Sequence, residues 1–330
     1  MHRWGRSQRC NEGQGKHDDI PSDRRRREHS QRAGRRTVER QSQLRGRRGQ
    51  SAHWEPAQGA PREEQVKFIK CDVNDYNDIA PLFFTFRFDY VFHYAAVVGV
   101  QRTLSNPLWV LRDITGIENV LNLSKNTGVK RIYYSSSSEV YGEPSEYPQH
   151  ETTTPLNSRL PYAVVKNVGE TYLRTYYREF GLKYVIFRFF NTYGPNQSED
   201  FVVPRFLRQA LNNDDITVYG DGSQTRTFCY VDDNIEACLS AHRSSIECET
   251  LNIGSDSEIA ILTLARTIID IAKSKSKIAF KPPLPEGDMA GRRPDVTKMR
   301  ILLGRELTSL KEGIRKLIAH YKRGRRERHD

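Results

Sequence analysis

Hydrophobic positions follow a repeating pattern from Val66 onward. Short runs of β-branched and aromatic residues alternate with longer stretches in which apolar residues recur at helical spacing. The runs predict four strands: VKFIKCDV at 66–73, YVFHYAA at 90–96, RIYYSSSS at 131–138 and KYVIFRFFN at 183–191. Because these runs are almost continuously apolar, we expect strands that are buried on both faces, as in a parallel sheet.

Two long amphipathic segments lie between these strands. One begins at Pro107 and ends at Gly128, and the other begins at Tyr162 and ends at Gly181, so that each ends at a residue suited to a helix C-cap. The apolar residues of the first fall largely on one stripe: Val110, Ile114, Ile117, Val120, Leu121 and Leu123. Strands alternating with such helices predict an α/β fold, a doubly wound parallel sheet covered by helices on both faces.

The chain changes character after Asn191, where loops become longer and strands shorter. Further elements are predicted as strands at 216–221, 228–233 and 250–255 and helices near 203–212, 233–243, 260–274 and 308–322. We therefore expect a sheet domain at 66–190, a smaller C-terminal α/β lobe at 191–322 that binds the substrate, and a charged tail at 323–330.

Composition separates the first 65 residues from the rest. Residues 1–65 contain 16 basic and 9 acidic residues but only 11 hydrophobic ones, and they carry +7 of the formal net charge of +11. A segment with so few apolar residues cannot bury a core, so we expect it to be disordered or mistranslated. The remaining +4 gives no reason to expect a nucleic acid as partner.

Several protein classes are disfavoured by the sequence. The five cysteines form no C-x-x-C pair, so neither a disulfide framework nor a metal site is expected. No apolar run reaches transmembrane length, and the N-terminus has no secretion signal. These features predict a cytoplasmic protein without a membrane partner.

Tyr162 and Lys166 form a Y-x-x-x-K pair on the second helix. The i, i+4 spacing places both side chains on one helix face, where an ammonium favours the phenolate and makes the tyrosine a usable general base. A solvated pair of helix residues has the same spacing. The serine-rich strand end 135–138 precedes this helix and predicts a shared cleft, because function in such sheets lies where strands meet loops.

A second polar group follows the fourth strand. Arg188, Asn191, Gln224 and Arg226 lie among glycine- and proline-containing loops, where two guanidinium groups and two carboxamides could clamp an anionic diphosphate. The alternative is that these side chains only stabilise the loops.

Together these motifs resemble the NAD-dependent epimerase/dehydratase family, the extended short-chain dehydrogenase/reductases that act on nucleotide sugars. The matching landmarks, in order, are CDV at 71–73, HYAA at 93–96, SSSSEVYG at 135–142, YAVVK at 162–166, RFFNTYGP at 188–195, YGDGSQTRTFCYVDD at 219–233, NIGS at 252–255 and GRRPD at 291–295. The resemblance implies a Rossmann-type domain that binds NAD, a lobe that binds a nucleoside-diphosphate sugar, and a homodimer.

The resemblance also implies roles for single residues. Tyr162 would take the proton of the sugar C4 hydroxyl, Lys166 would assist it and bind the nicotinamide ribose, and Ser137 would bond the same sugar oxygen. Asp72 and Val73 would contact the adenine, and Ala95 and Ala96 would form part of the cofactor wall. Asn191 and Arg226 would bind the diphosphate. Tyr219 would pack near the nucleobase, and Arg292 would close the pocket.

The fate of the 4-keto intermediate separates three activities. Dehydratases of this family resemble the chain but have Asp where Ser138 stands, which disfavours dehydration. UDP-glucuronate decarboxylases resemble it in SEVYG and YGDGSQTRTFCYVDD, and Glu139 and Arg292 fit decarboxylation, although those enzymes usually have Thr where Ser137 stands. A UDP-sugar 4-epimerase requires only reduction of the ketone on the other face. The sequence does not decide between the decarboxylase and the epimerase activity.

The element that should open the family's fold is absent from the sequence. It is a strand followed by G-x-x-G-x-x-G at a helix N-terminus, which binds the cofactor pyrophosphate. No glycines in residues 1–65 have that spacing. We therefore expect a Rossmann-type fold without its N-terminal strands, and weak or no NAD binding by the chain as written. The segment is either a frame-shifted translation or, alternatively, a basic arm through which an inactive family member binds nucleic acid or a partner.

Overall fold

A computed structural model describes residues 66–99, 103, 105–143, 146–283 and 291–326. The chain divides into two units, residues 1–69 and 70–330, and the fold described below belongs to the second. The segment 1–65, expected to be disordered or mistranslated, lies outside the described residues. So do residues 327–330 of the predicted tail.

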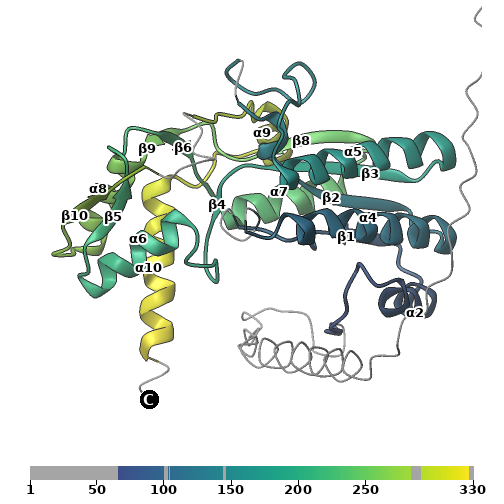
Figure 1. Cartoon of the computed structure of the whole chain (residues 1–330), viewed down its shortest axis with the longest axis horizontal. Coiled ribbons are helices and arrows are strands. Elements are labelled where there is room, and N and C mark those ends of the chain that lie inside the picture. The colour runs from purple at the N-terminus through teal and green to yellow at the C-terminus, as the bar shows by residue number, and fades with distance from the viewer. Residues whose placement is uncertain (1–65, 100–102, 104, 144–145, 284–290, 327–330) are drawn as a thin grey trace, which may run out of the picture. The chain divides into compact units, whose positions relative to one another are not determined.

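A four-stranded parallel sheet forms the centre of the larger unit (Figure 1). Its strand order is β1-β2-β3-β8, and its strands are β1 (Tyr90–His93), β2 (Arg131–Ser137), β3 (Lys183–Phe189) and β8 (Glu249–Ile253). In the register, Tyr134 of β2 lies between His93 and Ile186. The prediction of a parallel α/β sheet of the Rossmann type is confirmed.

The strand predicted at 66–73 is wrong. Residues 66–72 form no regular structure, and Val73 and Asn74 form a turn before α2 (Tyr76–Phe86). No described strand pairs with residues 66–73. An extended segment is stable as a strand only when a neighbour satisfies its backbone N–H and C=O groups.

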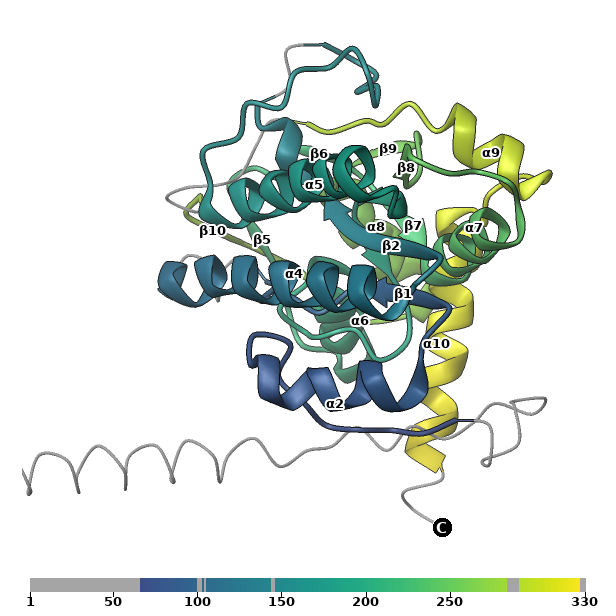
Figure 2. The same cartoon turned by 90° about the vertical axis from the view of Figure 1, so that its right-hand side faces the viewer.

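Helices cover both faces of the sheet (Figures 1 and 2). The helices α4 (Pro107–Thr127) and α5 (Pro161–Phe180) lie side by side on one face, while α7 (Val231–Arg243) and α9 (Thr297–Leu303) cover the other. Successive residues of β2 point to opposite faces of the sheet, so each face has its own hydrophobic core. Tyr134 packs with α4 and α5, whereas Tyr133 packs with α7. Gly128 and Gly181 end α4 and α5 in the left-handed region, as predicted.

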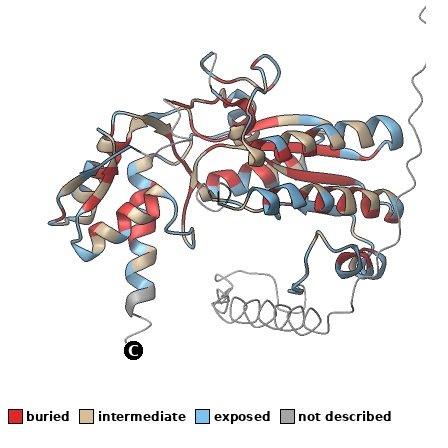
Figure 3. Cartoon of the chain, in the orientation of Figure 1, coloured by how far each residue is buried: buried red, intermediate tan, exposed pale blue. Residues whose placement is uncertain are grey.

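A second hydrophobic core lies in the C-terminal part of the unit (Figure 3). It is built from α6 (Val202–Asn212), α8 (Ile261–Ala272), α10 (Leu310–Arg326) and the parallel pair β5 (Ile216–Tyr219) and β10 (Ile278–Lys281). Two further pairs are parallel β4 (Thr192–Tyr193) with β7 (Cys229–Tyr230), and antiparallel β6 (Thr225–Thr227) with β9 (Glu258–Ala260). Helix α10 continues to Arg326, into the stretch expected to be tail.

Candidate active site

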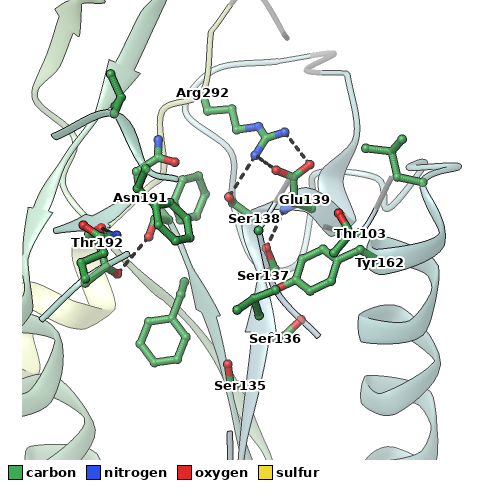
Figure 4. A pocket seen from close by; sticks show the side chains of 18 of the residues that line it. Thr103, Ser135, Ser136, Ser137, Ser138, Glu139, Tyr162, Asn191, Thr192 and Arg292 are labelled. Atoms are coloured by element: carbon green, nitrogen blue, oxygen red, sulfur yellow. Dashed lines mark hydrogen bonds and ion pairs between the residues drawn. The ribbon is translucent and has the colours of Figure 1, made fainter. Parts of the chain in front are cut away.

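A cavity of about 360 Å³ lies at the carboxyl ends of β2 and β3, where open α/β sheets bind their ligands (Figure 4). It is lined by residues 135–139 at the end of β2, residues 160–162 at the start of α5, residues 189–192 at the end of β3, and Arg292. Six of the residues singled out from sequence line it: Ser137, Ser138, Glu139, Tyr162, Asn191 and Arg292.

The serine-rich strand end turns into the cavity because Ser137 caps a short helix. Its backbone is extended, and its Oγ accepts a hydrogen bond of 3.2 Å from the backbone N–H of Glu139, starting the 3-10 helix η2 (Ser138–Tyr141). Ser138 and Glu139 therefore face the cavity rather than continuing the strand.

Tyr162 and Lys166 occupy one face of α5 next to this turn. The Lys166 ammonium donates a hydrogen bond of 2.6 Å to the Ser135 carbonyl and lies 5.7 Å from the centre of the Tyr162 ring. Tyr162 faces the cavity, whereas Lys166 is 3% exposed and lies beneath it. Gly169 lets α5 approach the sheet this closely, because a Cβ there would lie 2.2 Å from the Tyr134 hydroxyl.

Burial dominates the acid–base properties of this pair. It raises the pKa of Tyr162 to about 12; a hydrogen bond with Ser137 opposes the rise, and the charges of Glu139 and Asp113 add to it. Burial also lowers the pKa of Lys166 to about 8. The sequence argument, in which Lys166 brings the pKa of Tyr162 toward neutrality, is therefore wrong for the protein alone.

The buried Arg292 and the half-buried Glu139 form a bidentate ion pair in the cavity wall (Figure 4). The two guanidinium nitrogens donate to the two carboxylate oxygens over 2.6 and 2.7 Å, and one also lies 3.5 Å from the Ser138 hydroxyl. Arg292 is 6% exposed. This fork is the geometry in which arginine recognises carboxylates and phosphates.

The predicted substrate contacts do not all meet at the cavity. Asn191 lines it and donates a hydrogen bond of 3.2 Å to the Thr227 carbonyl. Tyr219, at the end of β5, and Arg226, on β6, are not among the residues that line it. The Arg205 guanidinium lies 5.5 Å from the centre of the Tyr219 ring.

Arg188, considered from sequence as part of an anion clamp, lies inside the protein instead. It is 1% exposed and donates two hydrogen bonds, of 2.9 and 2.7 Å, to the two oxygens of Glu170. Glu170 is one turn after Lys166 on α5 and also accepts from Ser136 over 2.6 Å. Arg188 therefore joins β3 to α5 and cannot reach a ligand in the cavity.

None of the four predicted cofactor contacts lines the cavity. Asp72 and Val73 precede α2, where the Asp72 carboxylate accepts the backbone N–H of Asn74 over 2.9 Å. Ala95 and Ala96 follow β1 directly, with Ala95 exposed and Ala96 half-buried.

Two functional candidates were not found from sequence. Gln197 lines the cavity, donates to the Thr192 carbonyl over 2.8 Å, and has a buried Oε1 atom without a hydrogen-bond partner in the described part of the chain, so that it can accept from a ligand hydroxyl. Asp113 is 8% exposed on α4. It interrupts the apolar stripe between Val110 and Ile117, and a charge on a buried stripe is the signal that could have identified it.

The parallel sheet with a cavity at the carboxyl ends of its strands is typical of α/β enzymes, and comparison with known proteins gives the family. Residues 33–254 match the family described as the NAD dependent epimerase/dehydratase family. The chain belongs to this family. The match begins at residue 33, upstream of the landmarks found in the sequence and within the segment outside the described residues.

Two curated relatives are decarboxylases. UDP-glucuronic acid decarboxylase 1 of Danio rerio is 34% identical over 286 residues, covering 84% of this chain and 65% of that protein. UDP-N-acetyl-alpha-D-glucosaminuronate decarboxylase of Bacillus cytotoxicus is 37% identical over 225 residues, covering 64% of this chain and 70% of that protein. The chain thus spans somewhat less than two thirds of the length of the Danio rerio relative.

Among solved structures, the fold is similar to that of UDP-glucose 4-epimerase of Thermotoga maritima with UDP-glucose. The TM-score is 0.74 at 30% sequence identity, with 80% of this chain and 88% of that chain covered. No described helix of the present chain is both long and apolar enough to span a membrane.

Proposed function

We propose that this protein is an NAD-dependent nucleotide-sugar enzyme that decarboxylates a UDP-hexuronate, such as UDP-glucuronate, through a 4-keto intermediate. Both curated relatives described above are decarboxylases of UDP-uronates. The single observation that carries the proposal is Arg292. Among the described residues that line the cavity, it is the one cation, and it already binds a carboxylate in bidentate geometry.

Arg292 favours a carboxylate-bearing sugar over a neutral one. A sugar carboxylate would compete with Glu139 for the same guanidinium fork, on the wall next to Ser137 and Tyr162. A neutral hexose has no carboxylate for this fork, so an epimerase substrate could offer it only the diphosphate. We therefore favour the decarboxylase over the 4-epimerase, although the fold is similar to that of an epimerase.

The described residues fit the nicotinamide end of NAD. The buried Lys166 ammonium has three donors, and its hydrogen bond to the Ser135 carbonyl occupies one, which leaves donors for ribose hydroxyls. Ala95 and Ala96 would contact the cofactor, and Asp72 and Val73 its adenine. When bound, NAD supplies the acceptor for the hydride that leaves C4.

The chain's own residues would handle the proton and the carboxylate. Tyr162 takes the proton of the C4 hydroxyl, and Ser137 holds the same oxygen by a hydrogen bond. The resulting C4 ketone is β to the carboxylate and accepts the electron pair of the C5–carboxylate bond as carbon dioxide leaves. Arg292 orients the carboxylate, while Asn191 and Gln197 contact the rest of the nucleotide sugar.

Product analysis tests the proposed function. The chain is incubated with NAD and with UDP-glucuronate, UDP-glucose or dTDP-glucose, and products are identified by mass and NMR. We expect loss of carbon dioxide from UDP-glucuronate and no change in the neutral sugars. An isobaric product from UDP-glucose would instead identify an epimerase, and loss of water a dehydratase.

Replacing Arg292 by Met is expected to lower decarboxylation by roughly 10²–10³-fold, because the guanidinium that orients the carboxylate is removed. Arg293→Met is the matched control, since Arg293 is adjacent, more exposed, and pairs with Glu258 over 3.7 Å instead. Turnover of UDP-glucuronate is measured for both variants. Equal activity of Arg292→Met and wild type would show that the carboxylate binds elsewhere.

We also propose a homodimer formed through α4 and α5. Apolar side chains are exposed on these helices, most strongly Leu108 at 74% and Phe180 at 55%. Exposed leucine and phenylalanine side chains on two neighbouring helices are suited to packing against a second copy. Light scattering on the full chain should give a dimer, and Leu108→Glu should shift it toward monomer.

We also propose that the protein is cytoplasmic, and its cysteines support this location. Cys71, Cys229, Cys238 and Cys248 are all free thiols. Unpaired thiols persist in a reducing compartment, which supports the proposal. Fractionation of cells that express the chain tests it.

A further inference from the structure

Two hydrogen bonds join α5 to the carboxyl end of β2. Tyr162, Lys166 and Glu170 recur at i, i+4 spacing and therefore lie along one side of α5. The Lys166 ammonium donates to the Ser135 carbonyl over 2.6 Å, and the Glu170 carboxylate accepts from the Ser136 hydroxyl, also over 2.6 Å. Consecutive residues of the strand thus hold consecutive turns of the helix that carries the proposed base.

The Glu170 carboxylate is held in one orientation by its other partners. It is fully buried, and Arg188 of β3 donates to both of its oxygens over 2.9 and 2.7 Å. Arg174, one turn further along α5, donates to Oε2 over 2.8 Å. The Arg188 guanidinium is itself fixed, because it also donates to the Tyr141 hydroxyl over 2.9 Å. A carboxylate held by such a fork presents a fixed acceptor to Ser136.

Ser136 lies between the strand end and the helix. It stands between Ser135 and Ser137 at the end of β2 and is 2% exposed (Figure 4). Its side chain shares a face of the strand with Tyr134, two residues earlier. On that face α5 is in direct contact, because a Cβ at Gly169 would lie 2.2 Å from the Tyr134 hydroxyl. A serine hydroxyl has a single donor, and here Glu170 accepts it.

We propose that Ser136 is a positioning residue for the reaction. Its hydrogen bond to Glu170 fixes α5 against the end of β2 and thereby fixes where Tyr162 and Lys166 lie. A displacement of about 1 Å can lower a rate by roughly 10²-fold, so the bond matters more for turnover than for binding. The effect on turnover rests on the proposed function, whereas the effect on the Lys166 hydrogen bond is a property of the protein alone.

The test changes Ser136, because Glu170→Gln would remove the carboxylate that pairs with the buried Arg188. Ser136→Ala removes the hydroxyl without changing any charge, and Ser136→Thr keeps a hydroxyl. In Ser136→Ala we expect kcat for UDP-glucuronate to fall by about 10–10²-fold with KM changed by less than about twofold. Ser136→Thr should recover most of that loss.

Thr154→Ala is the matched control. The Thr154 hydroxyl is also buried and donates to a carboxylate, that of Glu146, over 2.7 Å, but it does not line the cavity. Urea unfolding measures the stability of both alanine variants, and Thr154→Ala should keep the wild-type kcat. An equal fall of kcat in Thr154→Ala would overturn the proposal, because the effect would then be one of general stability. A raised KM with unchanged kcat in Ser136→Ala would overturn it too, since the hydroxyl would then bind the ligand itself.

A measurement without substrate or cofactor follows the Lys166 ammonium by NMR. The protein is labelled with ¹⁵N-lysine, and the signal is assigned by its loss in Lys166→Met. At pH 6, below the Lys166 pKa of about 8, we expect the ammonium protons to exchange with water at least about threefold faster in Ser136→Ala than in wild type or Thr154→Ala. Unchanged exchange would overturn the proposal whatever the turnover. Absence of turnover by the wild type would count against the proposed function, and the exchange rates would still decide the role of Ser136.

Discussion

Tyr162→Phe is expected to lower turnover by about 10²–10⁴-fold while leaving nucleotide-sugar binding largely intact. The substitution removes only the hydroxyl that faces the cavity beside Ser137 and keeps the ring that packs on the hydrophobic core. The proton of the C4 hydroxyl then has no acceptor at the right place. Turnover of UDP-glucuronate and calorimetric binding of UDP-glucuronate are the two measurements.

The control uses a second tyrosine of the same helix. Tyr177→Phe removes a hydroxyl from α5 at a position 44% exposed and outside the cavity lining. It should retain wild-type turnover. If Tyr162→Phe kept more than a tenth of the activity, another group would have to act as the base.

The pH dependence follows from Lys166. Its ammonium is charged below its pKa of about 8 and loses its proton above it, so kcat/KM should decline above about pH 8. Lys166→Arg keeps a charge that does not titrate in this range and should remove that decline, whatever its effect on the maximal rate. The measurement is a pH profile of kcat/KM for both proteins. A decline that persists in Lys166→Arg would belong to another group.

Sequence patterns predicted the strands at 90–96, 131–138 and 183–191 and the glycines that end α4 and α5, because these features depend on local spacing and backbone preference. The strand at 66–73 has the same composition, but a strand also requires a neighbour, and pairing is a non-local property. Composition within that segment could not reveal that no described strand pairs with it.

The arginines show the same limit for the site. Arg188 was expected to clamp an anionic diphosphate and Arg292 to close the pocket, and each lies in a motif that contains one glycine and one proline. In the structure, the two arginines have different partners and different surroundings. Arg188 faces Glu170, which lies 18 residues earlier on another element, whereas Arg292 reaches the cavity beside Glu139. Hydrophobic periodicity predicts which face of a helix a residue lies on. It does not predict which charged side chains contact each other between distant elements.

Arg188→Met is expected to lower the free energy of unfolding by up to about 3–5 kcal/mol, because it removes the buried partner of both Glu170 oxygens and leaves the buried carboxylate paired only with the half-exposed Arg174, over 2.8 Å. The Arg188 and Glu170 side chains are almost fully inaccessible, and the Arg188 guanidinium also donates to the Tyr141 hydroxyl over 2.9 Å. Urea unfolding measures the loss. Arg178→Met is the control, since Arg178 pairs with Glu179 on the surface, where a salt bridge contributes about 0–1 kcal/mol.

Acidification should distinguish loss of the ion pair from loss of packing. Burial alone raises the pKa of Glu170, but the hydrogen bonds and charge of Arg188 hold it below its usual range. The wild type therefore loses this contribution only as pH falls through that lowered pKa. In Arg188→Met only Ser136 and Arg174 still oppose the effect of burial, so the Glu170 pKa rises and protonation relieves the less well compensated charge. The deficit should then be smaller at pH 5 than at pH 8, whereas a packing defect would give the same deficit at both.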